Sequence, residues 1–367
     1  MKIAIVHDWL TNMGGAENLI INFNEMYPDA PIYTSVYNPD NIDERLRNSD
    51  VRTTFLQKKN KKISNHKKYF PLMPLAFENL DLNEYDVILS SSTCCAKGII
   101  PRPGATHICY CNTPMRYAWE KREDYTKNMG GLKKKLIGIL THYMRMWDVT
   151  SSSRVDYFIA NSSAVKERIE KYYRREAVVI NPAVRCNLFN ISDTDGDYYF
   201  VVSRLVSYKR FDLAVQACKE LGKKLIVIGD GPEKENLQKL AEGCDNIKFL
   251  GRLEDAEVKR YMAECKALLF PGEEDFGITP VEAMASGRPV VAYGRGGALD
   301  TVIDGKTGIL FKEQTVEDVK NAILKLENMK FDKKEIRKHA LKFDEKEFKE
   351  KIRNFIDEKI KERNKTV

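Results

Sequence analysis

The stretch GEEDFGITPVEAMASGRPVV, residues 272–291, joins two short apolar runs through a glycine-containing loop and a helix. The flanking runs ALLF, 267–270, and PVVAYG, 289–294, are apolar and partly β-branched, which predicts strands. The segment is therefore typical of a strand, helix, strand unit, in which two parallel strands are joined by a helix that packs on their sheet.

The same alternation of strands and helices continues along all 367 residues. We expect strands at KIAIVHD, PIYTSVY, YDVILSSS, HICYCN, YFIANS and AVVINP in the first half, and at YYFVVSR, KLIVIGDG, NIKFLG, ALLFPG, PVVAYG and GILF in the second. This pattern predicts an α/β fold of two doubly wound, Rossmann-like domains that face each other across a cleft.

The domain boundaries are expected where the chain becomes polar and rich in turn residues. The segment NLFNISDTDGDYY, 187–199, is the expected linker, so the first domain covers 1–186 and the second 187–345. Residues 346–367 read as a C-terminal helix with one apolar stripe on a charged surface. Such a stripe must pack on something, and we expect the first domain.

Polar and glycine clusters directly follow most of the expected strands, where open parallel sheets bind their ligands. In the loop SRLVSYKR, Arg204 comes directly after its strand and Lys209 opens the next helix. A guanidinium fork and a lysine ammonium together suit phosphate groups. The alternative is that both are solvated loop cations.

Glu274 and Glu282 flank a glycine and a proline in the opening stretch. One explanation is local: Thr279 caps the helix, Pro280 takes its first position, and Glu282 completes a capping box. The other explanation is a ligand. Gly277 would let it approach the backbone, the helix N-terminus would attract a phosphate, and the two carboxylates would accept bonds from sugar hydroxyls. Both explanations stay open.

The net charge of +7 is unevenly distributed along the chain. Residues 1–190 hold 27 Lys and Arg against 20 Asp and Glu, whereas residues 191–367 hold 33 of each. The excess includes QKKNKKISNHKKYF, 57–70, and LKKKLIGILTHYMRMW, 132–147. The second run places these apolar residues on one helical stripe: Leu132, Leu136, Ile139, Leu140, Tyr143 and Trp147.

The basic, amphipathic first half allows two interpretations. It is either a solvated face over a domain core or a surface that docks on an anionic membrane. Nucleic acid is not expected, because the basic runs carry no nucleic-acid-binding motif. The N-terminus lacks a secretory signal and no apolar run reaches membrane-spanning length, so we expect a cytoplasmic protein. The eight cysteines form no C-x-x-C pair, which indicates core residues rather than a metal site.

With these residues assembled, the chain resembles the retaining GT-B glycosyltransferases that carry an E-x(7)-E motif and use nucleotide-diphosphate sugars. EEDFGITPVEAMASGRPVV, SRLVSYKRFD and GDGP are similar to the donor half of that group. HICYCNTPMRYAWE and HDWLTNMGGAE look more like bacterial mannosyltransferases of surface-polysaccharide assembly. The resemblance implies transfer of a hexose, with GDP-mannose the favoured donor, to a glycan or lipid-linked glycan. It also implies no metal ion or other cofactor.

The resemblance assigns roles to positions of this sequence. It implies that Glu282 binds the ribose hydroxyls, that Glu274 binds the donor sugar, and that Arg204 and Lys209 bind the diphosphate. The other donor-binding positions lie near the phosphates or the base, and they are Gly15, Phe276, Gly277, Ile278, Thr279, Arg252 and Leu253. An acceptor linked to lipid implies a peripheral position on the inner face of a membrane.

One position departs from the family pattern. Relatives with the segment YC-x-TPMRY usually carry histidine where this chain has Asn112. Asparagine can donate a hydrogen bond, but it cannot carry charge or move a proton at neutral pH. His107 lies near the start of the same strand and is expected to be structural. Two other functions therefore stay open: a sugar-nucleotide epimerase of GT-B fold, and a catalytically impaired sugar-nucleotide-binding protein.

Overall fold

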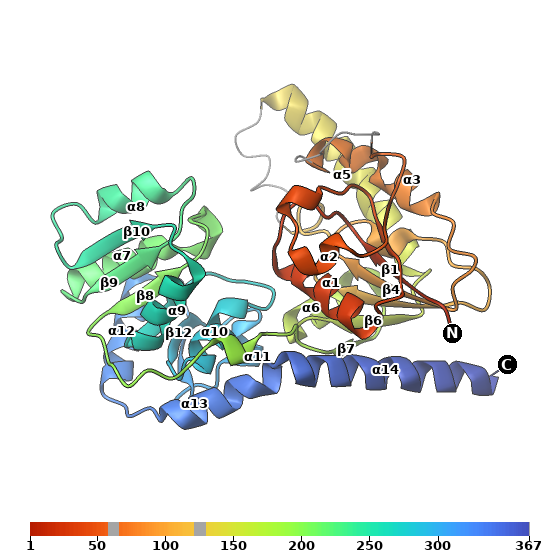
Figure 1. The fold of residues 1–367 in the computed structure, drawn as a ribbon. Helices are drawn as coiled ribbons and strands as arrows, with labels where there is room; N and C mark the ends of the chain where they lie inside the picture. The colour runs from red at the N-terminus through yellow and green to blue at the C-terminus, as the bar shows by residue number, and fades with distance from the viewer. Residues whose placement is uncertain (58–65, 121–129, 367) are drawn as a thin grey trace. The chain divides into compact units, whose positions relative to one another are not determined.

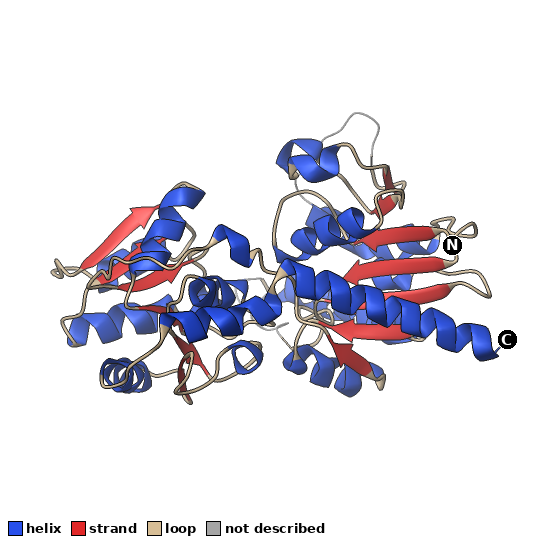
Figure 2. Cartoon of the chain, turned by 60° about the horizontal axis from the view of Figure 1, so that its bottom comes forward, coloured by secondary structure: helices blue, strands red, loops and turns tan. Residues whose placement is uncertain are grey.

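The computed structural model describes residues 1–57, 66–120 and 130–366, in two compact units. The first unit is Met1–Ala183 with Phe348–Val367, and the second is Val184–Glu347. Each unit is a parallel sheet with helices on both of its faces (Figures 1 and 2). The expectation of an α/β fold with two doubly wound, Rossmann-like domains is confirmed.

The first unit holds a seven-stranded sheet in the order β3-β2-β1-β4-β5-β6-β7, with every neighbouring pair parallel. Its strands are β1 (Ile3–His7), β2 (Ile32–Thr34), β3 (Val51–Thr53), β4 (Val87–Ser92), β5 (Thr106–Cys111), β6 (Tyr157–Ala160) and β7 (Ala177–Val179). Its helices include α1 (Gly15–Met26), α2 (Glu44–Arg47), α3 (Met73–Glu78), α5 (Gly131–Ser152) and α6 (Ser163–Tyr173), with 3₁₀ turns η1 (Pro39–Asn41), η2 (His66–Leu72) and η3 (Ala96–Gly98).

The second unit holds a six-stranded parallel sheet in the order β10-β9-β8-β11-β12-β13. Its strands are β8 (Tyr199–Val202), β9 (Leu225–Ile228), β10 (Ile247–Gly251), β11 (Ala267–Phe270), β12 (Val290–Tyr293) and β13 (Gly308–Phe311). Its helices are α7 (Phe211–Glu220), α8 (Lys234–Leu240), α9 (Asp255–Glu264), α10 (Ile278–Ala285), α11 (Ala298–Thr301), α12 (Val316–Glu327) and α13 (Lys333–Ala340), with η4 (Cys186–Leu188), η5 (Ser207–Lys209) and η6 (Leu341–Phe343).

The apolar strands form these sheets because both of their faces are buried. In β1, Ile5 packs in the core beneath α1, whereas Ala4 and Val6 pack in a second core on the opposite face. In β8, Val201 and Phe200 divide between two cores in the same way. Continuous apolar runs are typical of such doubly covered parallel strands.

All twelve expected strands are present, and the sheet of the first unit has one more. The additional strand is β3, Val51–Thr53, which lies at the edge of the sheet and pairs only with β2 among the described strands. It is three residues long and its central residue, Arg52, is exposed. So short an edge strand has no apolar periodicity to reveal it.

The expected linker, 187–199, belongs to the second unit. Its Asp195 accepts hydrogen bonds from both Arg288 and Lys333, and Arg288 also donates to the carbonyl of Thr194. These contacts tie the segment to the start of β12 and to the first residue of α13, both in the second unit. The unit boundary after Ala183 lies three residues before the expected one at 186/187.

The C-terminal helix α14 (Glu345–Thr366) packs on the first unit. Its apolar stripe, Phe348, Ile352, Phe355 and Ile356, is buried in the same core as Ile5 and Leu89 of the sheet. The Phe348 ring lies 6.0 Å from that of Tyr110 on β5 and 6.5 Å from that of Phe23 on α1. The first unit is therefore built from both ends of the chain.

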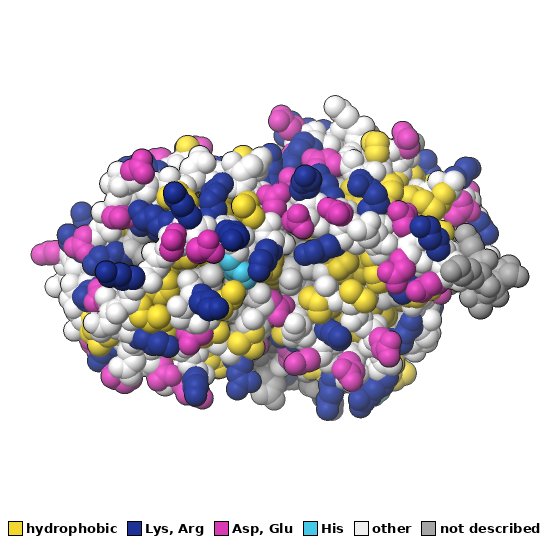
Figure 3. Space-filling view, turned by 90° about the horizontal axis from the view of Figure 1, so that it is seen from below, with side chains coloured by type: hydrophobic (Ala, Val, Ile, Leu, Met, Phe, Trp, Pro, Cys, Tyr) yellow, Lys and Arg dark blue, Asp and Glu magenta, His cyan; other side chains and the backbone are white. Residues whose placement is uncertain are grey.

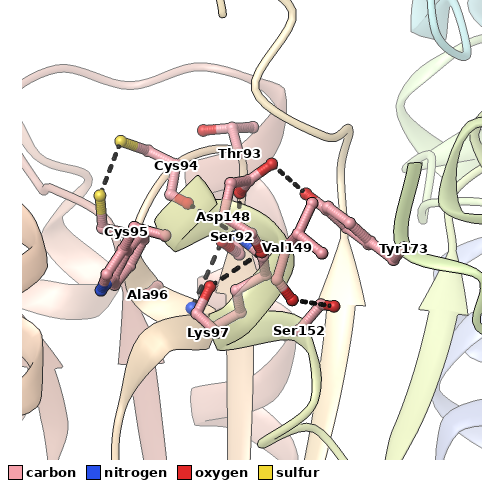
Figure 4. Close-up of polar contacts among 12 residues, drawn as sticks. Ser92, Thr93, Cys94, Cys95, Ala96, Lys97, Asp148, Val149, Ser152 and Tyr173 are labelled. Carbon is pink, nitrogen blue, oxygen red and sulfur yellow. Dashed lines mark hydrogen bonds and ion pairs between the residues drawn. The ribbon is translucent and has the colours of Figure 1, made fainter. Parts of the chain in front are cut away.

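A buried polar cluster joins α5 to the loop that follows β4 (Figure 4). The ammonium of Lys97 donates to the Asp148 carboxylate, and both side chains are almost fully buried. Trp119 and Tyr173 donate to the second oxygen of Asp148, at 2.8 and 2.9 Å. Burial alone would lower the pKa of Lys97, but the Asp148 carboxylate beside it raises that pKa above its usual value, so the ammonium stays charged.

The apolar residues expected on one stripe of 132–147 differ in how far they are buried on α5. Leu140 and Trp147 are partly buried and pack against the core of the first unit. Leu132, Leu136, Ile139 and Tyr143 are instead exposed. The expected stripe is therefore present, with Leu140 and Trp147 along its partly buried edge and the other four residues facing solvent. Residues 58–65 of the other basic run lie outside the described residues.

Seven of the eight cysteines are buried and all are free, as expected for core residues. His107, expected to be structural, is fully buried on β5. Its Nε2 lies 2.8 Å from the Ser90 hydroxyl, and its Nδ1 lies 3.2 Å from the carbonyl of Arg154. Burial lowers the pKa of His107 to about 4, so it is neutral at physiological pH.

Candidate functional site

The sheet of the second unit reverses its strand order between β8 and β11. From β8 the chain continues to β9 and β10 on one side, whereas β11, β12 and β13 follow on the other. The loops after β8 and β11 therefore diverge at the carboxyl edge of the sheet, and such switch points are where doubly wound sheets bind ligands. Arg204 and Lys209 lie in the first of these loops, and Glu274 and Gly277 lie in the second.

The two loops pack on each other without an intervening side chain. A Cβ atom placed on Gly272 would lie 2.8 Å from the Cα of Lys209 and 2.9 Å from the carbonyl oxygens of Tyr208 and Lys209. Only glycine fits at that distance. The contact sets Lys209, on one loop, beside the start of the other.

Lys209 and Glu274 form an ion pair across these loops. The ammonium of Lys209 donates to a carboxylate oxygen of Glu274, and Lys209 is only 9% exposed. The same ammonium lies 5.9 Å from the ring centre of Phe270, at the end of β11, and 5.8 Å from that of Tyr208. A buried cation needs such a counter-charge, so the pair fixes both side chains at the strand ends.

Two arginines of the expected site are exposed. No hydrogen bond or ion pair to the Arg204 guanidinium is found within residues 1–57, 66–120 and 130–366, and the same holds for Arg252. Leu253, beside Arg252, is partly buried and packs against the core. Arg204 thus adds a solvated cation at the edge where Lys209 is already paired.

Helix α10 begins earlier than its sequence suggests. Its N-cap is Gly277, with φ of +84°, and Ile278 is the first helical residue. No side chain caps the helix. Thr279 and Pro280 therefore lie inside the first turn, and the capping box expected for Glu282 is wrong. The reason is that glycine adopts the left-handed conformation that turns the chain from loop to helix.

The first turn of α10 leaves backbone N–H groups without partners inside the helix, as every helix start does. A side chain at Gly277 would be strained, because its φ is +84° and its Cβ would lie 3.0 Å from the Phe270 ring. The N–H groups without a partner inside the helix and the positive end of the helix dipole favour an anion. Phe276, just before the cap, is buried and packs beneath this turn.

Glu282 lies one turn further along α10. It is partly buried, and no hydrogen bond to its carboxylate is found among the described residues. Burial raises the pKa of Glu282 to about 7; Lys259 opposes this rise and Asp255 adds to it. A carboxylate that is desolvated without a partner is suited to accept hydrogen bonds from a ligand's hydroxyl groups.

In the first unit, three asparagines follow three neighbouring strands. Asn112 comes after β5, and its side-chain amide donates to the Ser91 hydroxyl at 3.0 Å. The amide of Asn161, after β6, donates to the carbonyl of Asn112, and that of Asn181, after β7, donates to the carbonyl of Asn161. This ladder holds Asn112 at the carboxyl edge of the sheet. Asn161 and Asn181 were not among the expected site residues, although each lies near the end of a run expected to be a strand.

Gly15 is the first residue of α1, and it is exposed at the carboxyl edge of β1. Beside it, the buried imidazole of His7 lies 3.6 Å from the Glu17 carboxylate and 3.3 Å from the carbonyl of Ser91. Asp8 accepts hydrogen bonds from the backbone of residues 93–96, which fixes the loop after β4. The structure thus places Gly15 and Asn112 in the first unit, whereas Arg204, Lys209, Glu274 and Glu282 belong to the second.

The carboxyl edge of the second unit's sheet combines two cations, Arg204 and Lys209, with two carboxylates, Glu274 and Glu282. It also holds the N-terminus of α10, which no side chain caps. This combination can bind a ligand that carries both anionic and hydroxyl groups.

The second unit matches a known family. Residues 189–346 match the family described as Glycosyl transferases group 1, and this range includes Arg204, Lys209, Arg252, Glu274 and Glu282.

Two curated relatives are similar over part of the chain. An uncharacterized glycosyltransferase of Methanocaldococcus jannaschii is 32% identical over 184 residues, which are 48% of this chain and 51% of that protein. A GDP-mannose-dependent alpha-(1-6)-phosphatidylinositol monomannoside mannosyltransferase of Mycobacterium tuberculosis is 33% identical over 141 residues, 34% of this chain and 37% of that protein. The chain thus spans about half or less of these relatives' length.

Solved structures match the whole chain in fold. The lipopolysaccharide outer core galactosyltransferase WaaB has a TM-score of 0.70 at 17% identity, and Anabaena HepE in complex with UDP has 0.73 at 19%. Each match covers 98% of this chain and 100% of the other. The chain therefore has the GT-B fold of two Rossmann-like domains, and residues 189–346 of the second unit are similar to Glycosyl transferases group 1.

Proposed function

We propose that this protein is a retaining glycosyltransferase that moves a hexose from a nucleotide-diphosphate sugar to a glycan or lipid-linked glycan. The observation that carries the proposal is the set of groups at the β8/β11 switch point: Lys209 paired with Glu274, the exposed Arg204, and the uncapped start of α10. These groups belong to the segment that matches the glycosyltransferase family. We assign them to donor binding, as the resemblance in sequence implies.

The proposed donor is GDP-mannose. The mannosyltransferase segments HICYCNTPMRYAWE and HDWLTNMGGAE favour mannose, and one curated relative is named as GDP-mannose-dependent. A structural neighbour is instead in complex with UDP, so UDP-sugars are the competing donors. The base is assigned to Arg252 and Leu253, and Glu282 to the ribose hydroxyls.

In the proposed reaction, the bond between the anomeric carbon and the diphosphate oxygen breaks, and negative charge develops on the leaving diphosphate. Arg204, Lys209 and the backbone of Gly277 to Thr279 stabilise that charge. The acceptor oxygen bonds to the same face of the anomeric carbon, and its proton passes to the diphosphate. No protein nucleophile and no metal ion take part in this scheme.

The two carboxylates have holding roles in this scheme. Glu274 accepts hydrogen bonds from the donor sugar while it stays beside Lys209, and Glu282 accepts from the ribose. Neither acts as the acid or nucleophile that a paired carboxylate supplies in a glycosidase. Asn112 and Gly15 are assigned to the first unit's share of the reaction, Asn112 near the sugar and Gly15 near the phosphates. A lipid-linked acceptor would place the reaction at the inner face of a membrane.

The function itself is tested by incubating the protein with GDP-mannose, GDP-glucose, UDP-glucose and UDP-galactose, each with and without lipid-linked acceptors. We expect glycosylated acceptor from GDP-mannose and only slow hydrolysis without acceptor. A sugar-nucleotide product from donor alone would indicate an epimerase. Donor binding by calorimetry without turnover on any acceptor would indicate an impaired binding protein, the alternative that Asn112 favours.

The diphosphate assignment predicts a rate loss when Arg204 is removed. Arg204→Ala should lower kcat by roughly a hundredfold or more, because the loss of one preorganised contact to developing charge costs about 3 kcal/mol. Lys325→Ala, which removes a surface lysine paired with Asp304 on the same unit, is the matched control and should leave kcat unchanged. Normal turnover by the Arg204 variant would remove that residue from the site.

The Glu282 assignment predicts a pH-dependent effect of Glu282→Gln. The pKa of Glu282 is raised to about 7, above its value near 4.5 in the unfolded chain. Its contribution to stability is therefore complete below pH 4.5 and is lost as pH rises through 7. The glutamine variant cannot ionise, so relative to wild type it should gain on the order of 1 kcal/mol of unfolding free energy between pH 5 and pH 8.

The same variant should bind GDP more weakly, measured by calorimetry at pH 8. Glu257→Gln, an exposed acid on α9, is the control for both readouts. A stability change with unchanged GDP affinity would show that Glu282 is structural only.

The departure at position 112 predicts a gain of function. Asn112→His should raise the transfer rate on the order of tenfold or more, because a positioned imidazole can carry charge and share a proton at the reaction centre. Asn112→Ala, which also loses the bond to Ser91, is the comparison and should not raise it. Equal rates for the histidine variant and wild type would exclude residue 112 from the chemistry.

A further inference from the structure

Helix α5 presents a stripe of large apolar side chains to solvent. Its members are Leu132, Leu136, Ile139, Tyr143 and Met146, whose exposed fractions are 75%, 59%, 51%, 61% and 52%. They recur at steps of four, three, four and three residues, so they share one face of the helix. Scattered exposed leucines are ordinary on protein surfaces, but a continuous apolar stripe marks an interaction site.

The opposite face of α5 is committed to the first unit's interior. Thr141 and Met144 are buried there, and Asp148 is held by Lys97, Trp119 and Tyr173. The helix therefore cannot turn its outer stripe inward without breaking these contacts.

The exposed charged side chains of α5 are all positive. Lys133, Lys134 and Lys135 are exposed beside the first turn of the stripe. The single acidic residue of the helix, Asp148, is buried and neutralised by Lys97. In contrast, basic and acidic side chains are interspersed over the face of the molecule drawn in Figure 3. An apolar stripe edged by lysines complements a surface that is apolar inside and anionic at its edge.

Helix α3 lies beside α5 and also exposes apolar side chains (Figure 1). The indole of Trp147 on α5 donates to Glu78 at the end of α3, at 2.8 Å. Leu75 on α3 and Leu72 just before it are 52% and 49% exposed. Exposed apolar residues therefore lie on two neighbouring helical segments of the first unit.

We propose that α5 docks the protein on an anionic lipid bilayer, lying in the plane of the interface with Leu132 to Met146 among the acyl chains and the three lysines at the headgroups. In the described part of the chain, no helix is long and apolar enough to cross a bilayer. A second copy of this chain is the less favoured occupant, because two such stripes bring no opposite charge to the lysines. The proposal rests on first-unit residues and is independent of the donor site.

The first test is flotation of the wild-type protein with vesicles of phosphatidylcholine, with or without phosphatidylglycerol. We expect binding to the anionic vesicles that weakens as salt is raised, because salt screens the lysines. Equal binding to both kinds of vesicle, or none to either, would overturn the proposal.

The apolar part is tested with Leu136→Glu combined with Ile139→Glu. The matched control is Ile100→Glu with Leu324→Glu, which adds the same charge at residues 53% and 41% exposed elsewhere. We expect the α5 variant to lose at least tenfold in partitioning onto anionic vesicles, and the control to stay within about twofold of wild type. An equal loss in both would assign the effect to net charge and overturn insertion of the stripe.

The basic part is tested with a variant in which Lys133, Lys134 and Lys135 are all changed to Gln. The control variant carries the same change at three exposed lysines elsewhere, Lys248, Lys334 and Lys361. Only the α5 variant should lose its preference for anionic vesicles, by roughly tenfold to a hundredfold. An equal loss in both triple variants would make the attraction a property of overall charge and overturn the lysines' role.

Two further measurements separate this proposal from its rivals. Sedimentation without vesicles should show the same species for wild type and the Leu136, Ile139 variant; a dimer that this variant dissolves would assign the stripe to a second copy. GDP binding should be equal in the two proteins, with circular dichroism showing that the variant is folded. Loss of vesicle binding would thus contradict the role of α5 while GDP binding persists, and loss of GDP binding would contradict the proposed function while vesicle binding persists.

Discussion

The candidate site depends on the reversal of strand order between β8 and β11. The strands that follow β8 in sequence, β9 and β10, lie on one side of it in the sheet, and β11 lies on the other side. The loops after β8 and β11 therefore run in opposite directions at the carboxyl edge of the sheet, which is where doubly wound sheets bind ligands. The contact of Gly272 with the main chain of Lys209 then brings the loops together at their base. The cations of one loop and the carboxylates that follow the other strand consequently lie at the same edge of the sheet. Lys209 and Glu274, which form an ion pair there, are 65 residues apart in sequence.

The pair of Lys209 and Glu274 shows how a buried charge can be kept available for a ligand. An ammonium that is only 9% exposed would be costly without a counter-ion, and Glu274 supplies one. A diphosphate bound at this edge would add negative charge beside Lys209. The ammonium of Lys209 is already desolvated in the folded protein, so its burial adds no further cost on binding. Arg204 differs because it is exposed, and its side chain must be ordered when it binds. Binding of a diphosphate would therefore cost side-chain entropy at Arg204 but not at Lys209, whose side chain is already fixed.

Sequence analysis predicted the elements that depend on local pattern and missed those that depend on a single backbone angle or on distant partners. The twelve apolar runs became strands, because buried parallel strands need continuous apolar sequence. The start of α10 was misplaced by two residues, because Thr279 looks like a cap whereas the left-handed Gly277 is the cap. The partnership of Lys97 with Asp148 joins positions 51 residues apart, and no spacing rule connects them. The site roles of Arg204, Glu274, Glu282 and Asn112 stay predictions.

The buried ion pair of Lys97 with Asp148 explains why α5 has an exposed apolar face at all. Burial of an outward leucine stripe would ordinarily be favourable, since each large apolar side chain gains about 1.5–3 kcal/mol when it leaves water. Rotation of α5 to bury it would pull Asp148 from Lys97 and leave a buried charge unpaired, which costs about 3–5 kcal/mol, and would expose Met144 as well. It would also break the hydrogen bonds from Trp119 and Tyr173. The interior of the first unit therefore holds the stripe outward, where only a second surface can cover it.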